Sequence, residues 1–335
     1  MKQKEKDEHF AAHIPGVLQY HQLMLGDETR NRLLARAIEQ YVTPHTTFLD
    51  IGAGTGVWAI LAAKLGANRV VAVEIEECLI PIIHKHAQEN GVAGRIEIIH
   101  GKSDDVKIKG KFDLVVSELF GNEAFGTDTV NSFIDVRTRF LAPGGVLIPQ
   151  KLTMFAVPAR VAGSVHDVPA GVPIKSEFLK TLKLNYMQNL PRSERDRVEF
   201  LAEPQELVQM DFQTITKPPT TTNLTASWKL KDISKANGIA IFNRSTFTDE
   251  IEMDSTDSQS WGMGVYEFTP FEKQSGELQI SLTIDAQNGN WTLSIPTNPA
   301  VRPQTYSPVF AFTRVRMAQQ MTPHRKFKAP KKATP

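Results

Sequence analysis

The sequence predicts an α/β protein in which a doubly wound parallel sheet is followed by an antiparallel β-barrel or sandwich domain. Short apolar segments alternate with amphipathic helical segments up to about residue 150, a pattern typical of β-α-β units. From about residue 153 onward, apolar and polar residues alternate over short segments separated by turn residues, which favours antiparallel strands. A chain of 335 residues is long enough for two such domains.

Four segments of the first half are short and rich in β-branched residues: 48–51, 70–74, 96–100 and 114–117. Because these apolar runs are continuous, we expect strands that are buried on both faces of a parallel sheet. The segments between the first three strands, which contain Trp58 and Ile80, place apolar residues on one helical face. An amphipathic helix is also predicted over 24–42, before the first strand.

The motif LDIGAGTG (49–56) lies where the first strand ends and the next helix begins. Gly52 and Gly54 allow positive φ and a close approach of a ligand to the backbone. Glu74, at the end of the second strand, is placed to accept hydrogen bonds from a ribose diol. A glycine motif alone also fits dinucleotide enzymes, but the Ala-Gly-Thr-Gly form with this acid favours S-adenosylmethionine as the cofactor. We assign Asp50 to the same site.

Three further residues are candidates for cofactor contacts. Asp104 follows the third strand, where its carboxylate can accept a hydrogen bond from the adenine amino group while the Ser103 amide meets a ring nitrogen. Arg30, in the helix predicted over 24–42, is a candidate partner for the cofactor's amino-acid carboxylate. For Asp104 and Arg30 the alternative is a solvated surface charge.

Acidic residues follow the fourth strand in the segment VVSELFGNEAFGTD (115–128). Glu118 lies directly after the strand, at the carboxyl edge of the sheet, where ligands of doubly wound folds bind. Glu123 and Asp128 follow in a glycine-flanked loop, and Thr127 or Asp128 also suits the N-cap of a helix. We therefore expect Glu118 in the site and leave the second acid open.

The composition argues against several classes of protein. The formal net charge is +1, so no overall field favours nucleic acid. No apolar run is long enough to cross a membrane, and the first ten residues lack the apolar region of a signal peptide. The single cysteine, Cys78, fits a reducing compartment, and the histidines show no paired metal-ligand spacing. We expect a cytoplasmic protein without a metal site, a nucleic-acid partner or a membrane partner.

The predicted domains follow from these patterns. Residues 1–17 are expected to form a flexible N-terminus, and 18–150 a Rossmann-like domain that binds S-adenosylmethionine and carries N-terminal lid helices. The β domain covers 151–318, with a helical arm inserted near 174–198. Residues 319–335 form a basic, proline-broken tail, which is typical of a flexible, solvated end.

Several segments together resemble the protein arginine N-methyltransferase family, in order from about residue 18 to about residue 295. The matching stretches are YHQLMLGDETR (20–30), LDIGAGTG (49–56), GKSDDV (101–106), SELFGNEAFG (117–126), APGGVLIP (142–149) and SWGMGVYEF (260–268). The resemblance implies a Rossmann-like domain followed by a β-barrel, and a helical arm that often forms a dimer. It also implies methyl transfer from S-adenosylmethionine to a guanidine nitrogen.

Carried over residue by residue, the resemblance implies that Met24 packs on the cofactor sulfonium and that Arg30 holds the cofactor carboxylate. The remaining cofactor contacts would be made by Gly52, Gly54, Glu74, Ser103 and Asp104. Glu118 would be the first acid of the substrate hairpin. Because a guanidinium is cationic at neutral pH, carboxylates offset its repulsion from the sulfonium and orient the attacking nitrogen. This chemistry needs no metal.

Two positions depart from the family pattern. The second hairpin glutamate of the family lies nine residues after the first, where this chain has Thr127. Glu123 and Asp128 are then the candidates for the second charge. The family's Thr-His-Trp loop is here Gln-Ser-Trp, in which Trp261 belongs either to the substrate pocket or to the β-domain core.

Three functions remain in view. The first is an N-methyltransferase acting on arginine, either free or within a peptide or protein, or on a small guanidino molecule, with a homodimer expected. The second is a small-molecule methyltransferase of the same fold that acts on a non-guanidine acceptor in a biosynthetic pathway, which the loss of the paired acids favours. The third is an inactive cofactor-binding scaffold.

Overall fold

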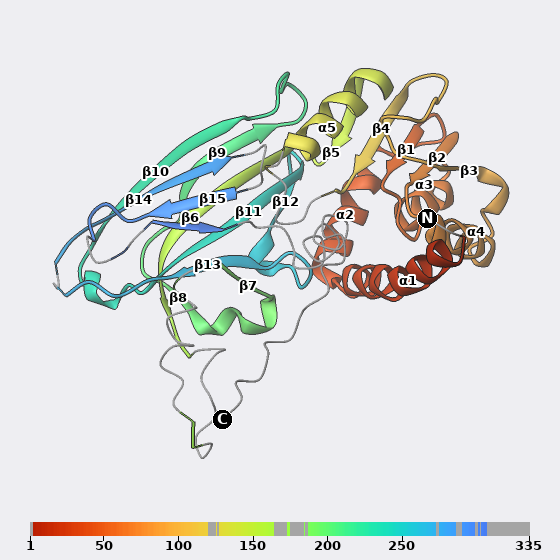
Figure 1. Cartoon of the computed structure of the whole chain (residues 1–335). Helices are drawn as coiled ribbons and strands as arrows, with labels where there is room; N and C mark the ends of the chain where they lie inside the picture. The colour runs from red at the N-terminus through yellow and green to blue at the C-terminus, as the bar shows by residue number, and fades with distance from the viewer. Residues whose placement is uncertain are drawn as a thin grey trace, which may run out of the picture.

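The computed structural model describes residues 3–119, 125, 127–163, 173–174, 184, 187–272, 275–285, 290–298, 301 and 303–306. Figure 1 shows an α/β half and a β half, with helix α5 (Thr127–Phe140) and strand β5 (Leu141–Ile148) between them. Among the helices that the model describes, none is long and apolar enough to cross a membrane.

The N-terminal half contains a five-stranded parallel sheet with the order β3-β2-β1-β4-β5. Its first four strands are β1 (Thr47–Ile51), β2 (Arg69–Glu74), β3 (Ile96–His100) and β4 (Phe112–Ser117). The connections contain α3 (Val57–Leu65), η1 (Glu77–Leu79), α4 (Ile80–Glu89), η2 (Ala93–Arg95) and α5. The chain order reverses between β1 and β4, and ligands bind at such switch points. The predicted fold class is confirmed.

Two helices precede the sheet: α1 (Gln3–Leu25) and α2 (Glu28–Tyr41). The segment 1–17, predicted to be flexible, is therefore helical from Gln3 onward, and lysine and glutamate, which are frequent there, are good helix formers. The single helix predicted over 24–42 is wrong at its start. Asp27 interrupts it and caps α2 by accepting a hydrogen bond from the Arg30 N–H at 3.2 Å.

The C-terminal half consists of two antiparallel sheets. The larger contains β6 (Lys151–Val161), β7 (Gln188–Leu190), β8 (Val198–Phe200), β9 (Gln205–Asp211), β11 (Gly238–Thr248), β12 (Ile251–Asp254) and β13 (Met263–Glu267). The smaller has the order β10 (Thr221–Leu230), β14 (Gly276–Asp285), β15 (Asn290–Ser294) and β16 (Gln304–Tyr306). No strand pair links the two sheets within the described residues, so they do not close into the predicted barrel. Met154 and Leu282 belong to one shared apolar core, as in a sandwich.

The helical arm predicted near 174–198 lies partly outside the described residues. Its described end contains β7 and the 3-10 helix η4 (Arg192–Arg197) instead of one continuous helix. Leu190 pairs with Met263 of β13, and Pro191 follows, where a missing N–H prevents further ladder pairing. The helix prediction is wrong for this part because strand pairing overrides the local helical pattern.

Aromatic packing joins the two halves. The rings of Phe133 in α5 and Phe212 after β9 stack with centroids 4.1 Å apart, and both side chains are fully buried. Arg137, one turn further along α5, donates to the Phe212 carbonyl at 2.5 Å and to the Ile215 carbonyl. The halves are thus fixed against each other by a stacked pair and by hydrogen bonds from a guanidinium.

We expect Phe212→Ala to lower the free energy of unfolding by about 3–5 kcal/mol, because it leaves a cavity against Phe133. Urea unfolding followed by circular dichroism measures the change. Phe212→Leu, which keeps most of the apolar volume, is the matched control and should lose much less. A loss below about 1 kcal/mol for the alanine variant would contradict the packing role.

Candidate active site

The glycine loop after β1 is held by the carboxylate of Glu74. Gly52 and Gly54 have φ of +72° and +57°, in the left-handed region that favours glycine. Glu74 ends β2 and is buried; its Oε2 accepts the Gly54 N–H at 2.6 Å, and its Oε1 accepts the Glu76 N–H at 2.8 Å. Burial raises the pKa of Glu74, although these N–H donors act in the opposite direction. The structure brings Glu74 to the loop, and its contact with a ribose stays a prediction.

Two side chains cover the glycine loop. A Cβ atom at Gly52 would lie 2.6 Å from Leu119 Cδ2, and one at Gly54 would lie 2.7 Å from His21 Cε1. His21 comes from α1, and burial lowers its pKa. His21 was not among the predicted site residues, because its place over the loop arises only from tertiary packing. The sequence signal that could have identified it is its position one helical turn before Met24, on the same helix face.

Asp50, at the end of β1, is bonded to the first turn of the helix that follows the glycine loop. Its side chain is 1% exposed, and its Oδ2 accepts the Ala59 N–H of α3 at 3.1 Å. Burial raises the pKa of Asp50 to about 7, while the Ala59 N–H opposes that shift. Asp50 therefore anchors the start of α3 behind the loop, and a direct cofactor contact stays a prediction.

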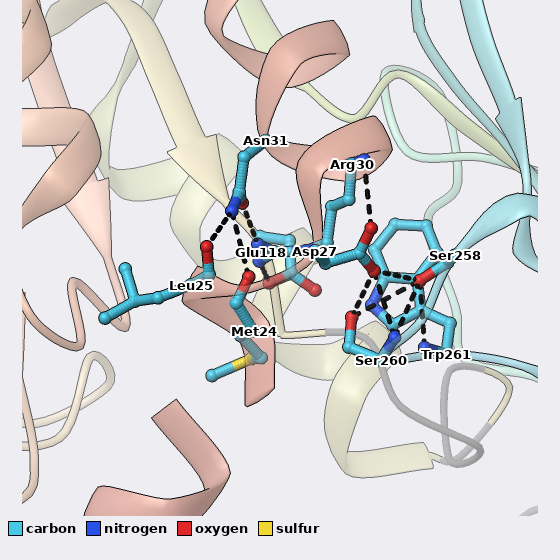
Figure 2. Close-up of polar contacts among 9 residues, drawn as sticks. All are labelled: Met24, Leu25, Asp27, Arg30, Asn31, Glu118, Ser258, Ser260 and Trp261. Carbon is cyan, nitrogen blue, oxygen red and sulfur yellow. Dashed lines mark hydrogen bonds and ion pairs between the residues drawn. The ribbon is translucent and has the colours of Figure 1, made fainter. Parts of the chain in front are cut away.

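Arg30 and Glu118 pair with each other. The Nη2 of Arg30 donates to Glu118 Oε2, and the two side chains are only 5% and 6% exposed. The Arg30 Cζ lies 6.0 Å from the centre of the Trp58 ring and 5.8 Å from that of the Trp261 ring. The sequence predicts that Arg30 contacts the cofactor and that Glu118 contacts the substrate. The structure shows the two in one ion pair (Figure 2).

The corner between α1 and α2 places Met24 near this pair. The Nδ2 of Asn31 donates to the carbonyls of Met24 and Leu25 at 3.0 and 2.9 Å, and its Oδ1 accepts from Arg30 Nη1 at 2.7 Å. Figure 2 shows Met24 and Arg30 joined through Asn31 in this way. Asn31 therefore ties the backbone of Met24 to the guanidinium of Arg30, a link that the sequence analysis missed.

The two predicted adenine contacts lie after β3. Asp104 is exposed and its Oδ2 accepts from Lys102 Nζ at 2.6 Å, a bond that lowers the pKa of Asp104. The Ser103 carbonyl accepts from Arg139 Nη2. In the structure Asp104 is thus engaged by Lys102, and its role with Ser103 toward an adenine stays a prediction.

The substrate candidates beyond Glu118 are only partly described. Glu123 lies outside the described residues. Thr127 begins α5, but its side chain also lies outside them, and Asp128 is exposed in the first turn of that helix. Trp261 is 8% exposed, so it belongs to the β-half core and also faces Arg30. Among the described side chains, no group of three or more His, Cys, Asp or Glu could hold a metal ion.

The α/β half matches a methyltransferase family. The family model described as ribosomal protein L11 methyltransferase (PrmA) matches residues 26–149. A ribosomal protein L11 methyltransferase from Pelotomaculum thermopropionicum is 39% identical over 123 residues, which cover 37% of this chain and 38% of that protein. The sheet order and the glycine loop with Glu74 agree with this match, so the α/β half is similar to these methyltransferases in sequence and in the form of its glycine loop.

Similarity to protein arginine N-methyltransferases extends into the β half. Probable protein arginine N-methyltransferase 6.2 of Oryza sativa subsp. indica is 29% identical over 226 residues, which cover 64% of this chain and 56% of that protein. A Trypanosoma brucei PRMT1 enzyme-prozyme complex with AdoHcy has a TM-score of 0.68 at 20% identity, covering 85% of this chain and 96% of that one. The matches span 24% to 56% of the curated protein arginine N-methyltransferases. The predicted resemblance to this family is confirmed.

We expect the pH dependence of stability to change in Asp50→Asn. The folded-state pKa of about 7 lies above the unfolded value of 3.8, so the contribution of the protonated carboxyl is complete at low pH and is lost as the pH rises through about 7. As the pH rises from 3.8 to about 7, the neutral Asn variant should therefore gain free energy of unfolding relative to the wild type. Urea unfolding at several pH values measures the difference.

The control for this experiment is Asp113→Asn. Hydrogen bonds from Thr47 lower the pKa of Asp113, so this carboxylate contributes stability that is lost as the pH falls. The control should therefore show a pH dependence of opposite sign. Parallel pH profiles for the wild type and Asp50→Asn would contradict the assignment.

Proposed function

We propose that the chain is an S-adenosylmethionine-dependent N-methyltransferase that acts on a guanidino nitrogen of arginine. The observation that carries the proposal is the environment of Glu118, which is buried at the carboxyl end of β4 close to the glycine loop. Its partner is already a guanidinium, that of Arg30, with Trp58 and Trp261 beside it. A site of this kind has the charge and the aromatic surfaces that a substrate guanidinium needs.

The glycine loop fits the cofactor. Gly52 and Gly54 have positive φ, and because glycine has no side chain, a ligand can approach their backbone closely where Leu119 and His21 now lie. The Glu74 oxygens accept the N–H groups of Gly54 and Glu76 and keep a lone pair for a ribose hydroxyl. Met24 and Arg30 come from the adjoining helices and would hold the amino-acid end.

The bound cofactor would supply a methyl group on a positively charged sulfonium. Glu118 would bind the cationic acceptor and draw positive charge toward its carboxylate, away from the attacking nitrogen. Because its oxygens are fixed at the end of β4, they would also orient that nitrogen. The burial of Glu118 strengthens both effects, since water is excluded from the pair.

One residue, Thr127, favours a second function, in which the methyl acceptor is not a guanidino group. Thr127 stands where the family has its second hairpin acid, and threonine cannot supply a charge. An acceptor that is not a guanidinium needs only one acid as base or hydrogen-bond acceptor. A small-molecule methyltransferase of the same fold is therefore the alternative. For either acceptor, we propose that the protein forms a homodimer and is located in the cytoplasm.

Labelled S-adenosylmethionine tests the acceptor. The protein is incubated with free arginine, with an arginine-rich peptide and with a cell extract, and the labelled products are identified by mass. Methylated guanidino groups support the proposal. Label on a non-guanidine product supports the alternative, and binding of S-adenosylhomocysteine without any transfer supports a scaffold.

We expect Glu118→Gln to lower kcat by about 100-fold or more, because it removes the charge that the transition state needs. The affinity for S-adenosylhomocysteine, measured by calorimetry, should not fall, because Glu118 would compete with the cofactor carboxylate for Arg30. Asp113→Asn, which removes an exposed acid near the start of β4, is the control and should keep its rate. Near-normal turnover of Glu118→Gln would overturn the role assigned to Glu118.

A further inference from the structure

A buried carboxylate lies where the α/β half meets the β half. Asp27 is fully buried, although it belongs to the short turn between α1 and α2. Its Oδ1 accepts the Arg30 N–H at 3.2 Å, so Asp27 fixes the backbone from which the Arg30 side chain extends. The other oxygen points away from α2 toward the β half (Figure 2).

The donors to this second oxygen come from the loop that follows β12. Asp27 Oδ2 accepts from Ser258 Oγ, from the Ser260 N–H at 3.0 Å and from Ser260 Oγ at 2.7 Å. Ser258 is also fully buried, and its Oγ accepts the Trp261 N–H at 2.9 Å. All donors to the carboxylate are uncharged. Burial raises the pKa of Asp27, but these bonds outweigh burial and leave the pKa below its usual value.

The Asp27 carboxylate therefore positions two parts of the Arg30 site. Through the N–H of Arg30 it fixes the start of α2, and through Ser258 it fixes the backbone of Trp261, whose ring lies 5.8 Å from the Arg30 Cζ. Arg192 of η4 bridges the same joint by donating to Thr29 Oγ1 at 3.1 Å and to the Asp257 carbonyl at 3.3 Å. The joint is thus built from several polar links, with Asp27 at its centre.

We propose that Ser258 and Ser260 are positioning residues of the Arg30 site, acting through Asp27 to hold Arg30 and Trp261 in register across the joint. This inference rests on the proposed function, in which Arg30 holds the carboxylate of the cofactor. The hydroxyls of both serines donate to Asp27, whereas Arg30 bonds to Asp27, Asn31 and Glu118. The serine hydroxyls add two donors to a buried carboxylate that otherwise has only the backbone N–H groups of Arg30 and Ser260. The carboxylate in turn orders both flanks of the guanidinium.

The test compares Ser258→Ala/Ser260→Ala with the wild type, using two ligands that differ in one group. S-Adenosylhomocysteine carries the amino-acid carboxylate, whereas 5′-methylthioadenosine shares the adenosine part and lacks that carboxylate. We expect the double variant to bind S-adenosylhomocysteine about tenfold more weakly, since it loses hydrogen bonds to a charged group. Its affinity for 5′-methylthioadenosine should be unchanged, because the hydrogen bonds of Glu74 hold the glycine loop and the serine hydroxyls donate to Asp27.

Two control variants separate positioning from general destabilisation. Ser260→Thr keeps the hydroxyl and should retain wild-type affinity for both ligands. Ser234→Ala removes a similar bond, in which Ser234 Oγ donates to Asp232 Oδ1 at 2.6 Å in η5 (Ile233–Lys235) of the β half. It should leave the ratio of the two affinities unchanged.

Equal ratios of the two affinities in the double variant and the wild type would overturn the positioning role. If the wild type binds neither ligand, the proposed function fails. The positioning role is then tested in the free protein by measuring amide hydrogen exchange. The Arg30 amide is bonded to Asp27 and not to either serine. Faster exchange of this amide in the double variant supports the inference, and unchanged exchange overturns it.

Discussion

The buried ion pair between Arg30 and Glu118 is the interaction on which the site depends. The two residues lie 88 positions apart in the chain, and each would be a costly buried charge without the other. The pair therefore fixes the start of α2 against the end of β4. Trp58 and Trp261 close around the guanidinium from the α/β half and from the β half. A displacement of the β half would remove Trp261 from the guanidinium and expose the pair to water.

The parallel sheet provides the frame for this pair. Because β1 and β4 are neighbours whose connections leave in opposite directions, the glycine loop and Glu118 emerge at one edge. The contact between Leu119 and the Gly52 position shows how close they are. Helices α1 and α2 then cover this edge, and the Asp27 hydrogen bonds attach them to the loop after β12. The site thus needs both halves of the chain.

The sequence predicted the parts of the site that depend on local pattern. Continuous apolar runs identify the strands, so Glu74 and Glu118 could be placed at strand ends without a structure. The partners of these acids could not be predicted, because Arg30 and Glu118, or Asp27 and Ser260, meet only through tertiary packing. The helical pattern near 188–197 misled for the same reason: pairing with β13 overrides local preference.

The Arg30–Glu118 pair also links the two ligands of the proposed reaction. In the proposed reaction, a cofactor carboxylate and Glu118 would compete for the same guanidinium, whereas a substrate guanidinium and Arg30 would compete for the same carboxylate. A ligand that engages its residue would weaken the internal pair and free the other residue for the second ligand. By linkage the effect is reciprocal. The buried pair of the free protein would thereby couple the binding of the methyl donor to the binding of the acceptor.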